Sequence, residues 1–175
     1  PANASFSYSQ PEYCIDDVSI VVPIFTANAI AGVFSATPAG LTIDPSTGLI
    51  NLSTSATGTY LVSNSVASLN ACPGDVANFT IKLVAPVTAT ISYNDPFCNT
   101  SSTIAPVTII GSTGGIFSST AGLSIDASSG AINPSASIPG NYTVTYTVID
   151  NGPCADGIFT VNVVIDQPVD ASFTF

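Results

Sequence analysis

The sequence has almost no positive charge. Among 175 residues there is one Lys and there is no Arg or His, against eleven acidic residues, so the formal net charge is −10. Such a chain offers no basic patch to nucleic acid or to an anionic membrane surface, and both are excluded as partners. Its longest apolar runs are also far shorter than the roughly 20 residues of a spanning helix, so we expect no membrane insertion by this segment.

The absence of His also bears on catalysis. Histidine is the commonest general base, so neither a Ser-His nor a Cys-His dyad can be built. Two carboxylates could hydrolyse a glycoside, but they would have to face each other in one pocket. The acids instead fall at predicted turns and domain ends, so we expect that the chain is not an enzyme.

A repeat is the main positive feature. Residues 39–51 (AGLTIDPSTGLIN) and 121–133 (AGLSIDASSGAIN) are identical at nine of thirteen positions. The pattern predicts a β-hairpin in each copy, in which the Asp accepts backbone N–H bonds and the Gly takes a left-handed conformation. The predicted structural turn residues are Asp44, Gly48, Asp126 and Gly130.

The repeat extends over nearly the whole sequence. Ala4-Ser-Phe-Ser-Tyr8 matches Ala89-Thr-Ile-Ser-Tyr93 and Ala171-Ser-Phe-Thr-Phe175. We therefore predict one repeat over residues 1–86, a second over 87–168, and the first strand of a truncated third over 169–175. Residues 171–175 would pair either within the chain or with another chain. No signal peptide is evident, so we expect the chain to be part of a longer protein.

Each repeat has about seven short alternating segments with turn signals every 8–12 residues. Tyr142 to Val148, in which apolar residues alternate with Thr, is the clearest of them. This pattern predicts an all-β fold of two tandem immunoglobulin-like β-sandwich domains. The short linkers at 85–87 and 166–169 contain proline, which favours a semi-rigid arrangement.

Four cysteines lie at Cys14, Cys72, Cys98 and Cys154. Three pairings are possible, and the simplest is one intradomain disulfide per repeat, Cys14–Cys72 and Cys98–Cys154. Each bridge would add about 4 kcal/mol in the chain-entropy model. Disulfides imply an oxidising compartment and export. A zinc site is the rival interpretation, although no histidine and no close Cys pair supports it.

Calcium is a further candidate, because it prefers carboxylate and carbonyl oxygens. Its weak candidate ligands are Asp16, Asp17, Asp95, Asp150, Asp166 and Asp170. The alternative is that these acids cap turns and keep the surface soluble, since no Asp-rich calcium loop is present. Lys82 could form an isopeptide bond, but the second repeat has no lysine.

The longest motif, which begins at Gly114 and continues through GLSIDASSGAIN to PGNYTVTY, resembles the Ig-like or cadherin-like tandem repeats of giant cell-surface gliding adhesins of Bacteroidota, the SprB type. The resemblance implies a non-catalytic structural repeat of an extracellular adhesin filament that serves cell adhesion and gliding motility. Its partners would be neighbouring repeats of the same chain and a surface polysaccharide or substratum. Two alternatives are a carbohydrate-binding or spacer module of a secreted hydrolase and a subunit of a self-assembling surface fibre.

Overall fold

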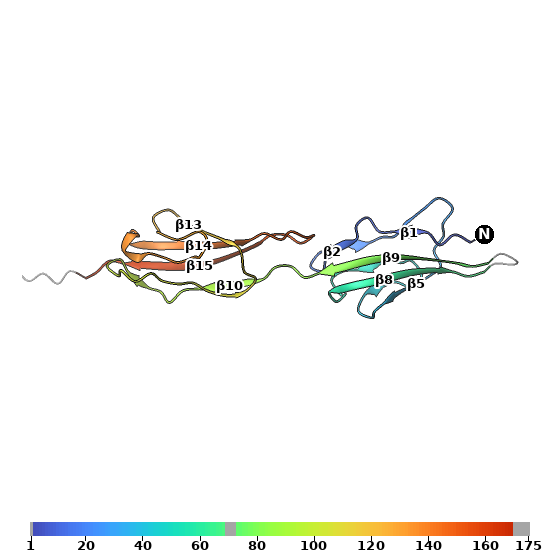
Figure 1. The fold of residues 1–175 in the computed structure, drawn as a ribbon, viewed down its shortest axis with the longest axis horizontal. Helices are drawn as coiled ribbons and strands as arrows, with labels where there is room; N and C mark the ends of the chain where they lie inside the picture. Colours follow the sequence, from blue (N-terminus) through green and yellow to red (C-terminus); the bar gives the residue numbers. More distant parts are fainter. Residues whose placement is uncertain (1, 69–72, 170–175) are drawn as a thin grey trace, which may run out of the picture. The chain divides into compact units, whose positions relative to one another are not determined.

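The computed structural model describes residues 2–68 and 73–169, which form two compact units (Figure 1). Unit 1 comprises the described residues of Pro1–Pro86 together with Asn151–Cys154, and unit 2 those of Val87–Asp150 and Ala155–Phe175. The predicted strand at residues 171–175 lies outside the described residues. In the part of the chain that is described, no helix is long and apolar enough to cross a membrane.

Unit 1 contains nine strands among its described residues. A four-stranded sheet has the order β2-β9-β8-β5, a three-stranded sheet has the order β3-β7-β6, and β1 pairs with β4. Their bounds are β1 (Phe6–Ser7), β2 (Glu12–Cys14), β3 (Ile20–Val21), β4 (Ile24–Phe25), β5 (Val33–Thr37), β6 (Thr42–Ile43), β7 (Ile50–Asn51), β8 (Gly58–Val66) and β9 (Asp75–Val84).

Unit 2 repeats this arrangement with fewer regular strands. Its four-stranded sheet has the order β11-β15-β14-β13, and β10 pairs with β12. Isolated bridges join Ile132 to Ala105 and to Ile125, where unit 1 has its three-stranded sheet. The bounds are β10 (Ala89–Ser92), β11 (Phe97–Cys98), β12 (Thr108–Gly111), β13 (Ile116–Ser119), the 3-10 helix η1 (Pro134–Ala136), β14 (Gly140–Val148) and β15 (Gly157–Asp166).

The alternating sequence places one face of each long hairpin inside. Successive side chains of a strand point to opposite faces, and in β14 the buried members are Tyr142, Val144, Tyr146 and Val148. In unit 1 the core lies between the four-stranded sheet and the smaller sheets. Its buried members include Phe6, Val21 and Ile50 from the smaller sheets and Phe34, Tyr60, Val62, Ile81 and Leu83 from the larger one. The prediction of an all-β fold with two immunoglobulin-like sandwiches is therefore confirmed.

Tyrosine hydroxyl groups tie the layers together at the same places in both units. Tyr8 donates to the carbonyl oxygen of Gly48 at 2.7 Å, and Tyr93 donates to that of Gly130 at 2.6 Å. Burial raises the pKa of Tyr93 to about 12, so its hydroxyl stays a donor at any physiological pH. Since each bond joins the first strand region to the repeated turn, it fixes the entry of the chain into the sandwich.

The turn glycines have a double requirement. Gly130 has φ +71°, and a Cβ added to it would lie 2.7 Å from the ring of Phe117; Gly48 meets Phe34 in the same way. Gly114 also has positive φ, +86°, but nothing lies within 4 Å of its added Cβ. Substitution at Gly114 therefore tests backbone strain alone, whereas substitution at Gly130 tests strain together with packing against Phe117.

We expect Gly130→Ala to lower the free energy of unfolding of unit 2 by about 2–4 kcal/mol, because left-handed strain and overpacking add. The matched control Gly114→Ala should cost only the strain, about 1–2 kcal/mol. Urea denaturation followed by tyrosine fluorescence measures both values. Equal losses in the two variants would show that the contact with Phe117 contributes nothing.

Candidate functional site

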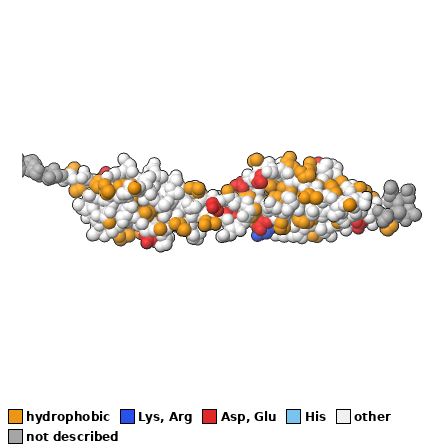
Figure 2. Space-filling model, turned by 90° about the horizontal axis from the view of Figure 1, so that it is seen from above, with side chains coloured by type: hydrophobic (Ala, Val, Ile, Leu, Met, Phe, Trp, Pro, Cys, Tyr) orange, Lys and Arg blue, Asp and Glu red, His pale blue; other side chains and the backbone are white. Residues whose placement is uncertain are grey.

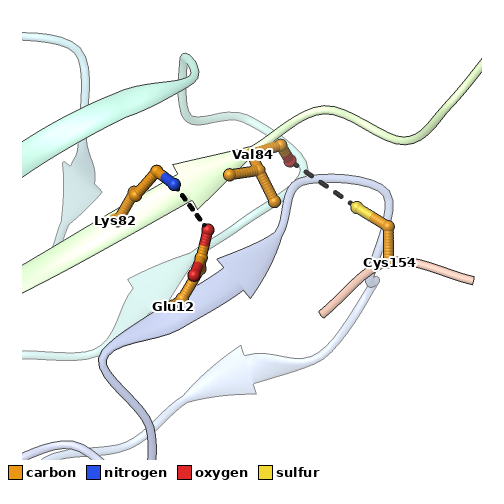
Figure 3. A network of polar contacts seen from close by, with 4 residues as sticks. All are labelled: Glu12, Lys82, Val84 and Cys154. Carbon is orange, nitrogen blue, oxygen red and sulfur yellow. Dashed lines mark hydrogen bonds and ion pairs between the residues drawn. The ribbon is translucent and has the colours of Figure 1, made fainter. Parts of the chain in front are cut away.

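The most distinctive chemical group of the structure is a disulfide in unit 1. It joins Cys14, the last residue of β2, to Cys154, with 5.0 Å between the two Cα atoms. Cys14 pairs with Val84 in the parallel register of β2 and β9. The sulfur of Cys154 lies 3.9 Å from the carbonyl oxygen of Val84 (Figure 3). This is a packing contact, since an oxidised sulfur has no proton to donate. Both cysteines are buried.

This connection corrects the predicted disulfides. Cys14 pairs with Cys154 rather than with Cys72, and Cys98 is an exposed free cysteine rather than the partner of Cys154. Cys72 lies outside the described residues. The physical reason is visible in unit 2. Cys98 pairs with Asp166 at one end of β15, whereas Cys154 precedes the other end, and a strand of ten residues spans about 30 Å. A disulfide tolerates no more than about 7 Å between Cα atoms.

An ion pair flanks the disulfide. Lys82 Nζ lies 2.8 Å from Glu12 Oε1, and the two residues face each other across β2 and β9 (Figure 3). On the face in Figure 2, the colour of the single cationic residue appears at one place, next to acidic side chains. Because the two side chains are 55% and 36% exposed, solvent screening limits the pair to about 0–1 kcal/mol.

One group of potential metal ligands is present among the described residues. The ligand atoms of Cys14, Asp16 and Cys154 lie within 4.8 Å of one another. Zinc is bound by thiolates, and the two sulfurs are instead bonded to each other. In the oxidised state the group therefore offers one carboxylate, which does not make a metal centre.

The calcium candidates do not form an acidic cluster within residues 2–68 and 73–169. Asp16 lies near the disulfide, and Asp17 accepts bonds from the backbone and hydroxyl of Ser19, whose hydroxyl contributes most to lowering the pKa of Asp17. Asp95 precedes Pro96, and Asp166 ends β15. The amide of Asp150 donates to Asp156. Asp170 lies outside the described residues.

The repeated turn acids each bind their own turn through one carboxylate oxygen. Asp44 Oδ1 accepts from the amides of Ser46 and Thr47 and from the Ser46 hydroxyl at 2.7–2.9 Å. Asp126 Oδ1 accepts from the amide and the hydroxyl of Ser128, and also from the amide and the hydroxyl of Ser129. These bonds hold the pKa of each carboxyl group well below its usual range. The largest lowering comes from the Ser46 hydroxyl at Asp44 and from the Ser129 amide at Asp126. Such acids are poor general acids or bases near neutral pH.

Each unit has a surface groove at the same place in the repeat. In unit 1 it is lined by Ser9, Tyr13, Asp17, Ser19, Ile20, Val21, Val22 and Ile24. In unit 2 it is lined by Asn94, Phe97, Ser101, Thr103, Ile104, Ala105 and Pro106. An aromatic residue, hydroxyl groups and an exposed isoleucine recur in both grooves.

Sequence reasoning missed the partners of two groups. Thr100 Oγ1 lies 3.0 Å from the sulfur of Cys98, a contact that only the spacing Cys98-Asn-Thr100 could have indicated. The buried Asn64 accepts from the amide of Gly32, and Tyr146 accepts from the amide of Gly115 at the equivalent place. Because the residue that accepts from the glycine amide is Asn in one repeat and Tyr in the other, no shared motif indicates this contact.

Comparisons with known proteins assign no family. No protein-family model and no curated protein sequence matches the chain. Among solved structures, the insect immune protein hemolin is 14% identical with a TM-score of 0.46, over 96% of this chain and 47% of hemolin. Murine CEACAM1b is 11% identical with a TM-score of 0.40, over 94% of this chain and 99% of the other. Drosophila N-cadherin EC1-4 is 12% identical with a TM-score of 0.41, over 94% and 50%.

The chain thus spans about half the length of the hemolin and N-cadherin structures. At these identities and TM-scores, the similarities carry no conclusion about relationship, ligand or activity. The resemblance to SprB-type repeats therefore depends on the sequence motifs alone.

Peptide mapping without reduction should recover Cys14 joined to Cys154, with Cys98 alkylated. Cys154→Ser should expose Cys14 to alkylation and lower the free energy of unfolding of unit 1 by about 3–5 kcal/mol, because the bridge spans a separation of 140 residues. Cys98→Ser is the control and should change stability by less than about 0.5 kcal/mol. A recovered Cys98–Cys154 peptide would contradict the observed connection.

Acid should weaken the repeated turns. The folded-state pKa values of Asp44 and Asp126 are lowered, so their stabilisation is complete above the unfolded value of about 4 and is lost as the pH falls below it. Asn at both positions keeps an acceptor oxygen but removes the charge. We expect the double variant to be less stable at pH 7, with a difference from wild type that shrinks below about pH 4. Urea denaturation across pH measures this difference.

Asp95→Asn is the control for net charge, because Asp95 is exposed and accepts none of the hydrogen bonds described for the structure. A difference between the double variant and wild type that does not change with pH would contradict the role of charge in the turns.

Proposed function

We propose that the chain is a non-catalytic structural repeat module of a long extracellular adhesin filament of the SprB type, which serves cell adhesion and gliding motility. The observation that carries this proposal is that several tyrosine, serine and aspartate side chains at equivalent places of the two repeats make the same contacts within the fold. Side chains used in this way stabilise the fold, and their recurrence specifies a unit that can be repeated.

Several pairs of contacts support this interpretation. Tyr60 donates to the carbonyl oxygen of Ala56 at 2.8 Å, and Tyr142 donates to that of Ile138 at 2.5 Å. Each bond returns to the backbone four residues upstream, which resembles the tyrosine corner of immunoglobulin-like domains.

The paired serines add a second example. Ser55 donates to the carbonyl oxygen of Asn51 and accepts from the amide of Thr42. Ser137 does the same with Asn133 and Ser124. In both repeats a buried hydroxyl thus links two backbone segments of the smaller layer.

The remaining features fit an exported chain. A buried disulfide is stable in an oxidising compartment, and a net charge of −10 keeps a hydroxyl-rich surface soluble. The acids with lowered pKa values lie in turns, which gives no pair of carboxyl groups set for glycoside hydrolysis.

A carbohydrate-binding or spacer module of a secreted hydrolase is the second candidate. The recurrence of a groove lined by hydroxyl groups and an exposed isoleucine favours it, because hydroxyl groups can hydrogen-bond to sugars. A subunit of a self-assembling surface fibre would instead bind other copies of the chain.

Deletion of one repeat in the parent protein tests the proposal. Removing residues 87–168 in frame takes out one complete period, so we expect surface labelling by an antibody against the chain, adhesion and gliding to persist. Removing residues 87–126 is the control, because it leaves part of a sandwich and should abolish surface display. Loss of adhesion with normal display after the 87–168 deletion, together with glycan-array binding by the isolated chain, would overturn the structural role and support the carbohydrate-binding module.

A further inference from the structure

The observed disulfide connects cysteines of different repeats. Cys14 and Cys98 are here called the strand cysteines of the two repeats. Cys72 and Cys154 precede the last long strand of their repeats in the sequence and are here called the loop cysteines. The bond therefore joins the strand cysteine of the first repeat to the loop cysteine of the second. The segment that carries this loop cysteine, Asn151–Cys154, belongs to unit 1.

Cys98 has the same backbone setting as Cys14. Each ends a short strand that pairs in parallel with the last residue of the long strand, Cys14 with Val84 and Cys98 with Asp166. The amide of the residue after each cysteine donates to the carbonyl oxygen of the same strand-end residue, Ile15 to Val84 and Asn99 to Asp166, at 3.0 Å in both cases.

The chain then turns in the same way after each strand cysteine. In unit 1 the amide of Asp17 donates to the carbonyl oxygen of Cys14 at 3.3 Å, and in unit 2 the amide of Ser101 donates to that of Cys98 at 2.9 Å. The backbone that presents the sulfur of Cys14 to a loop cysteine is thus present at Cys98.

The two positions differ in what covers them. Cys14 is 5% exposed and bonded, whereas Cys98 is exposed and free. Hydrogen bonds from the Thr100 hydroxyl and backbone lower the pKa of Cys98, against a smaller opposing effect of Asp166. Since the thiolate is the species that attacks a disulfide, this setting favours exchange.

We propose that Cys98 is the attachment point for the loop cysteine of a further repeat of the same kind, so that disulfides run from each repeat to the next rather than within repeats. The proposal rests on the proposed function only in requiring a further repeat. The bond forms by exchange with an external disulfide: the two thiols lose two protons and two electrons, and the external disulfide is reduced to two thiols.

An extended chain tests this pairing. Residues 1–168 are followed directly by a second copy of residues 87–168, a joint that keeps the register because Val87 aligns with Val169. In the appended copy Ala155→Ser marks the peptide that carries the loop cysteine; Ala155 is exposed. The chain is oxidised in glutathione buffer, alkylated, and digested with pepsin at low pH, where thiols do not exchange.

We expect Cys98 to be recovered joined to the marked peptide, and Cys14 to the unmarked one. Alkylation of Cys98 should fall at least about tenfold relative to the 175-residue chain. The control carries Cys154→Ser in the appended copy and should restore that alkylation. Cys98 that remains alkylated, or that is joined to glutathione or to the unmarked peptide, would overturn the proposal.

A second measurement covers the case in which the appended copy does not fold. The parent protein is extracted from cells into acid with an alkylating reagent, and Cys98 is located by mass spectrometry. Recovery in a disulfide with another loop cysteine supports the proposal, and recovery in alkylated form overturns it. Neither measurement uses adhesion as a readout, so a negative result is distinct from failure of the adhesin role in the deletion experiment.

Discussion

The long antiparallel hairpin of each repeat is the constraint on which the other elements depend. β8 and β9 pair over nine residues on each strand, as do β14 and β15. One edge of the hairpin accepts β5 or β13, and the other accepts β2 or β11 in parallel. Its inner face supplies four of the eleven buried core residues described for unit 1 and six of the eleven described for unit 2. The hairpin thus forms the centre of the four-stranded sheet and determines which face of that sheet is buried.

The length of this hairpin also decides the covalent connections. The strand cysteine pairs with the last residue of the second strand, whereas the loop cysteine lies before its first residue. Two groups at opposite ends of a ten-residue strand cannot meet. A loop cysteine must therefore find its partner outside its own sheet, and Cys154 does so in unit 1.

The fold class could be predicted from the sequence because its signals are local. Alternation of apolar residues and Thr in Tyr142 to Val148 has the period of a strand, and Pro23, which lacks an amide proton, lies between β3 and β4. Disulfide pairing is not local. The similar spacings of Cys14 to Cys72 and of Cys98 to Cys154 favour a bridge within each repeat, and only the strand register excludes it.

The same limit applies to the side-chain contacts. Glu12 and Lys82 are 70 residues apart, and they meet because β2 lies parallel to β9, which no sequence pattern predicts. The equivalence of Asn64 and Tyr146 cannot be predicted from the sequence either, because side chains of different length and chemistry accept from the amides of Gly32 and Gly115. Motifs find what both repeats share, and these contacts differ in residue type.

The placement of Lys82 has a consequence for proteolysis. Proteases of the trypsin type cleave after Lys or Arg, because an acidic pocket binds that side chain, and Lys82 is the only such residue in the sequence. It lies inside β9, its amide donates to the carbonyl of Pro11 at 2.8 Å, and its ammonium group is paired with Glu12. Cleavage there requires a central strand to leave its sheet. Proteases of this specificity therefore meet no cleavage site in an exposed loop of the folded chain.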